Sequence, residues 1–297
     1  MIKAIYHHPC LDGFTAAWVV NFFRSEILYN QDTPIEYLPG RYGDKPYLGE
    51  LAGHDVLMLD FSYKFDDMMA VLEVANTVEV VDHHESAERE LEKVKQAHDP
   101  EKHAHLKTHF DMERSGAGLT WDILIGGQRP PLIDYIEDRD LWRFRYTITG
   151  NINMALFSMD YSFATWRDLV GPHLDREDQH AICDELDAQG AAVSRKLDKD
   201  GREFIEQAAH PVVVGGYVVS AVNLPYFYAS HVGGILAKDQ PFGVVYFWEG
   251  NRWRFSLRSR EGGLNVAKIA EQYGGGGHAG AAGFELTPEQ AREYAVW

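Results

Sequence analysis

The first 85 residues alternate short apolar segments with helical ones, and this alternation constrains the fold more than any other feature. Runs that read as strands lie at 2–6, within 54–63 and at 78–84, and helical patterns separate them at 13–23 and 65–76. Strands that alternate with helices in this way pair in parallel and need helices on both faces. The sequence therefore predicts an α/β fold with a mostly parallel N-terminal sheet.

The segment after residue 84 is less regular. Residues 85–110 are polar, and we expect a surface excursion, with a solvated loop at its four histidines because their spacing fits no standard zinc motif. Two helices are predicted next, one at 115–127 with Ser115 as N-cap and one at 130–142 with Pro131 near its start.

The last 140 residues change character. From about 160 to 208 the pattern is charged and helical, strand-like runs follow at 210–223 and 242–259, and the sequence EGN inside the second run is a hairpin turn signal. For the aromatic stretch 224–230 we favour core packing over base stacking. The predicted organisation is an N-terminal domain (1–158), a helical connector (159–208) and a smaller C-terminal α/β domain (209–297).

Composition limits the function classes. The chain of 297 residues has a formal net charge of −17, which argues against a long nucleic acid as partner, because such binding relies on Lys and Arg neutralising phosphates. A small anionic ligand is compatible with this charge if a metal or a local cationic site offsets it. The two cysteines cannot form a disulfide framework, and there is no apolar run of about 18 residues and no signal-peptide pattern. We expect a cytoplasmic protein with no membrane partner, and a homodimer is compatible with the sequence.

Each of the three early strands ends in side chains that bind metals. The first runs into HHPCLDG (7–13), the second ends at Asp60, and the third ends at Asp82, His83 and His84. Ligands of parallel sheets bind beyond the carboxyl ends of the strands, so these side chains are aimed at one volume. Clustered carboxylates would repel one another without a cation, and mixed His and Asp ligation suits Mn, Fe, Zn or Mg. The sequence therefore predicts a metal site at this edge.

These motifs resemble the DHH/DHHA1 phosphoesterase superfamily, which includes RecJ-type exonucleases and nano-RNases. VVDHHES resembles its signature, YHHPCLDGFTAA its first motif, LDFSY its second, YIEDRDLW its fourth, and GGGGHAGAAGFEL the glycine-rich motif of its DHHA1 domain. The resemblance implies a catalytic, metal-binding DHH domain at 1–158 and a substrate-binding DHHA1 domain at 209–297. It also implies a hydrolase that cleaves phosphoester bonds with a metal-activated water in the cleft between the two domains.

The resemblance also implies roles for individual residues. The implied metal ligands are His7, Asp12, Asp60, His83 and Asp138; His8 remains an alternative to His7, and Asp140 an alternative to Asp138. Asp60 would bridge two metals. Asp82 would support His83, and His84 would contact the scissile phosphate, so that Asp82 and His84 are the catalytic residues. Mn²⁺ is the expected cofactor, with Mg²⁺, Zn²⁺ and Fe²⁺ as alternatives.

Cys10 departs from the family pattern, because many members have an aspartate at this position. A thiolate ligand would favour Zn or Fe over Mg, whereas packing as a small apolar residue is the competing interpretation. In the C-terminal domain, backbone N–H groups of Gly275, Gly276 and Gly277 can approach a phosphate closely, with His278 and Arg258 as further substrate contacts.

We therefore expect a nucleic-acid-binding oligoribonuclease or exonuclease that acts on short oligoribonucleotides or small nucleotides. A phosphatase, a cyclic-dinucleotide phosphodiesterase, and a nucleotide-binding regulatory protein with a weakened metal site are the alternatives.

Overall fold

A computed structural model describes residues 1–23, 33–170 and 176–293. The chain divides into two compact units, Met1–Gly190 and Ala191–Trp297, and the division falls within the long helix α10 (Arg176–Ala208). This helix and α9 (Phe163–Val170) occupy the segment predicted as a connector, of which residues 171–175 lie outside the described residues. Among the described residues, every helix is too short or too polar to cross a lipid bilayer.

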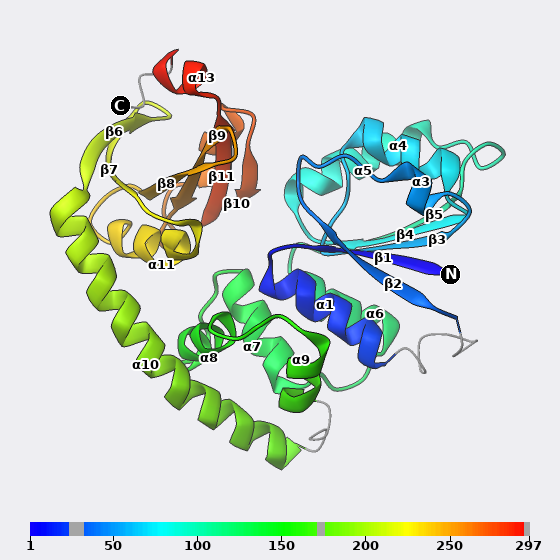
Figure 1. Ribbon diagram of the computed structural model, residues 1–297, viewed down its shortest axis with the longest axis horizontal. Coiled ribbons are helices and arrows are strands. Elements are labelled where there is room, and N and C mark those ends of the chain that lie inside the picture. The colour runs from blue at the N-terminus through cyan, green and yellow to red at the C-terminus, as the bar shows by residue number, and fades with distance from the viewer. Residues whose placement is uncertain (24–32, 171–175, 294–297) are drawn as a thin grey trace. The chain divides into compact units, whose positions relative to one another are not determined.

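The first unit is built on a parallel sheet (Figure 1). In the described residues its strands lie in the order β2-β1-β3-β4-β5, and every neighbouring pair is parallel. The strands are β1 (Ile2–His7), β2 (Ile35–Gly40), β3 (Asp55–Leu59), β4 (Thr77–Asp82) and β5 (His105–Phe110). The predicted α/β class with a mostly parallel sheet is confirmed.

The expectation of a surface excursion at 85–110 is wrong. This segment contains helix α5 (Glu85–Ala97) and the edge strand β5. An edge strand has one neighbour, so its side chains need not be apolar: Lys107 Nζ and His109 Nε2 each lie 2.8 Å from Glu79 Oε1 on β4. The histidines expected in a loop at 105 and 109 therefore belong to the sheet. Strand β2 was also missed.

Helices cover both faces of this sheet (Figure 1). Helix α1 is apolar all round because it lies between the sheet and further helices, and its residues 11–20 are all buried. The predicted N-cap is confirmed, since Ser115 Oγ accepts a hydrogen bond from Gly118 N at 3.2 Å. On the α1 side lie α1 (Leu11–Phe22), α6 (Gly116–Leu124), α7 (Pro131–Asp140), α8 (Thr149–Phe157) and α9; on the other lie α3 (Leu48–Leu51), α4 (Phe65–Val74) and α5.

The second unit contains a mixed sheet with the strand order β10-β11-β9-β8-β7-β6 in the described residues. Every neighbouring pair is antiparallel except β7 and β8, which helix α11 (Tyr226–Leu236) connects. The strands are β6 (His210–Val214), β7 (Tyr217–Asn223), β8 (Gly243–Glu249), β9 (Arg252–Arg258), β10 (Gly276–His278) and β11 (Ala281–Leu286). Helices α12 (Val266–Glu271) and α13 (Pro288–Glu293) complete the unit.

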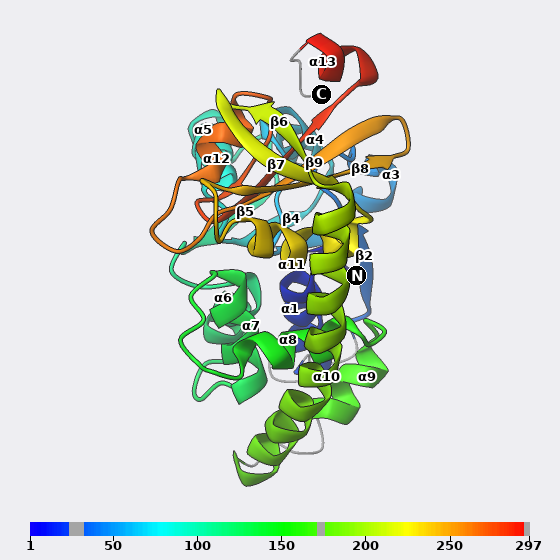
Figure 2. The ribbon, with the colours of Figure 1, turned by 90° about the vertical axis from the view of Figure 1, so that its left-hand side faces the viewer.

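Local sequence explains two features of this unit. Gly250, in the EGN sequence, has a φ of 62°, a left-handed conformation that suits glycine at the predicted hairpin turn between β8 and β9. Helix α11 lies beside the end of α10 (Figure 2), where Phe204 and Ile205 pack against the cluster that α11 forms with the sheet. The expectation that 224–230 packs in the core is wrong for Tyr226 and Phe227, which are 54% and 63% exposed because they occupy the first turn of α11.

Candidate active site

The ends of β1, β3 and β4 bring His7, Asp60 and His83 together. His7 Nδ1 lies 3.3 Å from Asp60 Oδ2, and His83 Nε2 lies 2.9 Å from Asp60 Oδ1. Asp60 and His83 are each 1% exposed. The two oxygens of one buried carboxylate thus face two different imidazoles, as expected when three parallel strands end at one edge.

The backbone around Asp60 is shaped for this contact. Asp60 has a φ of 54°, a left-handed conformation that costs an L-residue roughly 1–2 kcal/mol. Two glycines allow the close approach: a Cβ on Gly116 would lie 2.4 Å from Asp60 Cβ, and a Cβ on Gly13 would lie 2.7 Å from His7 Cβ. Any larger residue at 13 or 116 would displace the side chains of the site.

Asp12 reaches the same volume from the first turn of α1. Its carboxylate accepts hydrogen bonds from Gly116 N at 2.5 Å and Ala117 N at 3.0 Å, the first amides of α6. The start of a helix carries unpaired N–H groups and positive potential, and both favour a carboxylate there. Asp12 Oδ2 lies 3.8 Å from His83 Nε2, so this anchored carboxylate also faces the His83 side of Asp60.

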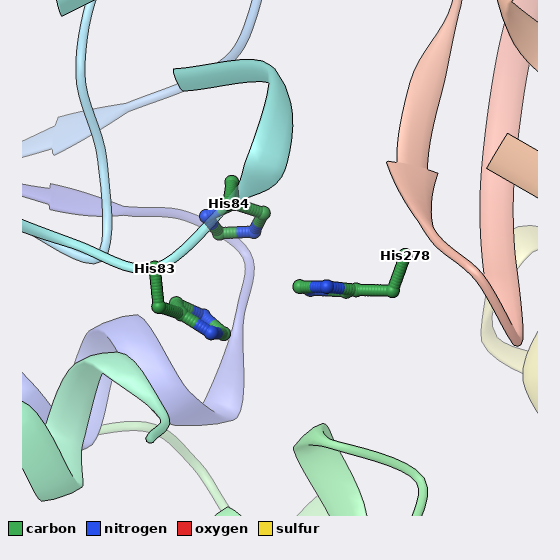
Figure 3. Close-up of side chains that lie close together, drawn as sticks. All are labelled: His83, His84 and His278. Atoms are coloured by element: carbon green, nitrogen blue, oxygen red, sulfur yellow. The ribbon is translucent and has the colours of Figure 1, made fainter. Parts of the chain in front are cut away.

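Asp82 and His84 form a second layer beside Asp60. The rings of His83 and His84 lie next to each other (Figure 3), with their centroids 4.5 Å apart. Asp82 is fully buried, and it accepts hydrogen bonds from Ser62 Oγ at 2.9 Å and from the backbone N of His83 at 2.7 Å. His84 Nδ1 lies 2.8 Å from Asp82 Oδ1. Asp82 therefore fixes the ring of His84 and the backbone that presents both histidines.

The structure separates the two candidates on α7. Both oxygens of Asp138 are used inside the unit, by Arg145 N at 2.9 Å and by Thr149 Oγ1 at 2.5 Å. By contrast, Asp140 Oδ2 lies 3.5 Å from His83 Nε2. The assignment of Asp138 as a metal ligand does not fit this geometry, because its carboxylate holds the loop after α7; the structure brings Asp140 to the site instead.

The choice between His7 and His8 also follows from position. The ring of His7 contacts Asp60 and lies 5.7 Å from that of His84, centroid to centroid. His8 points elsewhere and packs edge-on against Tyr6 at 6.1 Å. The structure thus brings His7 into the cluster, as the sequence analysis favoured.

Charge balance in the cluster depends on the imidazoles. Burial opposes ionisation of Asp60, but hydrogen bonds from His7 and His83 outweigh it and lower the pKa of this carboxyl. Burial likewise disfavours a charged His83, but its hydrogen bond to Asp60 and the charges of Asp140 and Asp12 raise the pKa of His83 to about 10. For Asp12, burial and the charge of Asp60 raise the pKa well above its usual range. The site therefore holds a surplus of negative potential that His83 offsets with a proton.

Cys10 lies within the reach of this potential. It is the N-cap of α1 and is partly buried. Burial, together with the charges of Asp60 and Asp140, raises the pKa of the Cys10 thiol well above its usual range. In the metal-free protein the sulfur therefore keeps its proton, and whether it acts as a ligand stays a prediction.

Within the described residues of the first unit, two groups of side chains have the composition of metal sites. Within each, one ligand atom per residue lies within 4.8 Å of the others; the groups are His7, Asp60, His84 and Asp12, Asp60, His83. Carboxylate oxygens with imidazole nitrogens suit Mn, Fe, Zn or Mg. The donor set therefore fits divalent cations, and Asp60 is common to both groups.

In the second unit, the glycine-rich run forms a hairpin. Gly276–His278 pair with β11, and a Cβ on Gly275 would lie 2.1 Å from the backbone oxygen of Gly283. His278 extends from the end of β10 (Figure 3). Arg258 is held by Ser256 Oγ at 3.0 Å. These contacts show what builds the hairpin, while the substrate contacts expected of Gly275, Gly276, Gly277, His278 and Arg258 stay predictions.

Comparison with known proteins agrees with the motifs. Residues 228–295 match the DHHA1 domain family. Oligoribonuclease NrnB of Bacillus subtilis is 34% identical over 105 residues, which are 35% of this chain and 25% of NrnB. Residues 228–295 thus belong to the DHHA1 domain family, and together with the similarity to NrnB this match indicates the DHH/DHHA1 superfamily. The expected enzyme class, a phosphoesterase, agrees with these similarities.

Two further similarities extend over most of this chain. The uncharacterized protein R106 of Acanthamoeba polyphaga mimivirus is 29% identical over 299 aligned positions, covering 95% of this chain and 67% of the viral protein. The crystal structure of an exopolyphosphatase-related protein from Bacteroides fragilis aligns with 99% of this chain and 89% of its own, with a TM-score of 0.48 and 15% identity.

Tyr42 is a site residue that the sequence analysis missed. Its hydroxyl lies 3.2 Å from His84 Nδ1, and its ring lies 4.9 Å from that of His7, centroid to centroid. Tyr42 follows strand β2, whose sequence IEYLPG contains proline and glutamate and was not read as a strand. Recognition of β2 would have predicted a polar residue at one more strand end.

Proposed function

We propose that this chain hydrolyses phosphoester bonds in short oligoribonucleotides or small nucleotides, with divalent cations held around Asp60. The observation that carries the proposal is the position of Asp60, whose Oδ2 faces His7 and whose Oδ1 faces His83. A carboxylate shared by two ligand groups is the arrangement that a two-metal phosphoesterase requires.

The proposal assigns metal binding and phosphate contact to different side chains. When bound, divalent cations would neutralise the phosphate, lower the pKa of a water and stabilise the departing oxygen. His7 would hold one cation with Asp60, while Asp12 and His83 would hold the other, with Asp140 beside them. Asp82 orients His84 through its Nδ1, and the anchored ring is in place to meet charge on the phosphate.

Two features support a short substrate. The net charge of −17 provides no extended basic track for a long strand. The relative NrnB is named an oligoribonuclease, although its similarity covers 35% of this chain. We therefore propose substrates of two to about five nucleotides.

A substrate and metal panel tests the proposal. Initial rates would be measured with di- to pentaribonucleotides, long single-stranded RNA, a cyclic dinucleotide and a nucleoside bisphosphate, each with Mn²⁺, Mg²⁺, Zn²⁺ or Fe²⁺. We expect the short oligoribonucleotides to react fastest and His84→Asn to lose at least about a hundredfold in rate. His105→Asn, on the edge strand β5, is the matched control and should be unchanged. Equal rates on long RNA and on a dinucleotide would contradict the substrate class.

Two substitutions test whether Cys10 is a metal ligand. If the sulfur is a ligand, Cys10→Asp should move the metal preference from Zn or Fe toward Mn and Mg, because carboxylate oxygen suits harder cations. Cys10→Ser should then lower the bound-metal stoichiometry measured by elemental analysis. Unchanged stoichiometry and metal ranking in both variants would show that Cys10 only packs. Nucleotide binding without turnover under any metal would instead support the regulatory alternative.

A further inference from the structure

The first unit contains a pocket of about 300 Å³ beside the candidate active site, and none of the motifs accounts for it. Its apolar part is formed by Ile5 on β1, Leu38 on β2 and Leu51 on α3. Ligand pockets of proteins range from about 300 to 1,000 Å³, so this pocket is large enough for a single small unit such as one nucleoside.

One of the two cations that line this pocket makes no ion pair within the described residues. Arg41, which lines it, is exposed and has no ion-pair partner among the described residues. Lys45 also lines the pocket, but both oxygens of Asp67 hold its ammonium, at 2.8 and 3.0 Å. In a chain with a net charge of −17, a free guanidinium next to a candidate phosphoesterase centre favours an anionic ligand.

Aromatic rings and free polar groups complete the lining. Tyr63 is buried, whereas Tyr47 is 71% exposed and offers its ring to a flat ligand. His8 Nδ1 is buried without a hydrogen-bond partner in the described part of the chain, so this imidazole has bonding capacity that the protein does not use. The carboxylates of Asp44 and Glu50 add acceptors for hydroxyl or amino groups. A nucleoside presents a flat base together with such groups.

Packed aromatic rings connect the lining of the pocket to the candidate metal centre. The ring of Tyr63 lies 4.9 Å from that of Phe61, and the ring of Phe61 lies 5.2 Å from that of Tyr42. Tyr42 in turn contacts His84 Nδ1 at 3.2 Å. Arg41 and Tyr42 are neighbours in sequence, and one contributes to the pocket while the other contributes to the centre. The pocket and the centre therefore share the short segment that follows β2.

We infer that this pocket binds one nucleoside of the substrate, with Arg41 contacting the phosphate attached to it and Tyr47 stacking on the base. The inference rests on the proposed function, because it names the part of the substrate that flanks the scissile bond. Stacking on an exposed tyrosine tolerates every base, so the pocket selects for a nucleotide unit rather than for a sequence.

Equilibrium binding tests the pocket without turnover. Calorimetry would compare AMP and inorganic phosphate as ligands of the full chain, with Mn²⁺ and in EDTA. Arg41→Ala should weaken AMP roughly tenfold and should also weaken phosphate. Tyr47→Ala should weaken AMP several-fold and leave phosphate unchanged. Arg252→Ala, an exposed arginine at the start of β9, removes the same charge elsewhere and should change neither affinity.

Kinetics separate a failure of the pocket from a failure of the proposed function. Arg41→Ala should raise KM for a diribonucleotide and for bis(p-nitrophenyl) phosphate, because both carry a phosphate. Tyr47→Ala should raise KM for the diribonucleotide several-fold and affect bis(p-nitrophenyl) phosphate, which has no nucleoside, far less. If neither substrate is hydrolysed, the proposed function fails, and AMP binding still decides the pocket. Unchanged AMP affinity in both variants, or an equal loss for Tyr47→Ala on both substrates, would overturn the inference.

Discussion

Replacement of Asp60 by Asn tests the electrostatic reasoning about the site. Asn is the suitable replacement because Asp60 has a φ of 54° and Asn tolerates the left-handed conformation better than Ala. The substitution keeps the shape of the side chain and removes its charge. His7 and His83 would then face a neutral amide, and a protonated His83 would lose its nearest counter-charge.

Asp60→Asn should lower the stability of the metal-free protein. In a cluster of carboxylates alone the opposite would hold, because neutralising one carboxylate would relieve repulsion. Here His7 and His83 stabilise the charged form of Asp60, and the pKa of Asp60 is lowered in spite of its burial. Removing one partner of a buried ion pair costs about 3–5 kcal/mol. At roughly 2 °C per kcal/mol or more, the Tm of the first unit in EDTA should fall by at least about 6 °C.

Scanning calorimetry in EDTA would measure this change, with Asp66→Asn as the matched control. Asp66 is exposed in the first turn of α4, and its neutralisation should change stability by no more than about 0.5 kcal/mol. Metal titration of the same variant should show loss of bound cations. A Tm for Asp60→Asn equal to or above that of the wild type would refute the claim that the imidazoles outweigh carboxylate repulsion.

Three further predictions concern the same site. Asp138→Asn should cost about 1–3 kcal/mol of stability with little effect on metal affinity. Asp140→Asn should weaken metal binding with little effect on stability. Denaturation measures the first effect and metal titration the second. The reverse pattern would restore Asp138 as the ligand. Gly116→Ala should abolish metal binding because its Cβ would lie 2.4 Å from Asp60 Cβ, while Gly150→Ala, which meets no atom within 4 Å, should bind metal normally. Finally, His83 holds a proton below its raised pKa of about 10, and a metal ligand must lose that proton. Metal affinity should therefore rise about tenfold per pH unit between pH 7 and 9. Calorimetry in buffers of different ionisation enthalpy would detect the released proton. A pH-independent affinity would mean that no proton leaves the site.

The sequence predicted those parts of the fold that periodicity controls. The strands ending at His7, Asp60 and Asp82 are buried on both faces, so each is a short apolar run that can be recognised without knowledge of its neighbours. The edge strands β2 and β5 lack this signal, because residues such as Lys107 need only one paired neighbour and keep polar side chains. Both edges of the sheet were therefore missed, and Tyr42 was missed with β2.

The two aspartates on α7 show a second limit of prediction from sequence. Asp138 and Asp140 are two residues apart on a helix, which places them about 200° apart around its axis, so that only one can face the cluster. Sequence spacing gives the separation but not the rotation of the helix. That rotation is set by Leu132, Ile133 and Ile136, which are buried in the core of the first unit. Only packing decides which aspartate reaches His83.

Backbone geometry positions the carboxylates of the site. A left-handed Asp60, two glycines that admit it and the first amides of α6 around Asp12 fix the carboxylates in position. The imidazole of His83 supplies the missing positive charge as a proton. We therefore expect a cluster balanced in this way to fold before it binds metal, and a cation bound by His83 would displace the proton of this imidazole. We therefore expect the donor atoms around the site to set the metal preference, and Cys10 is the unusual donor among them. The stability of the fold should have little influence on this preference.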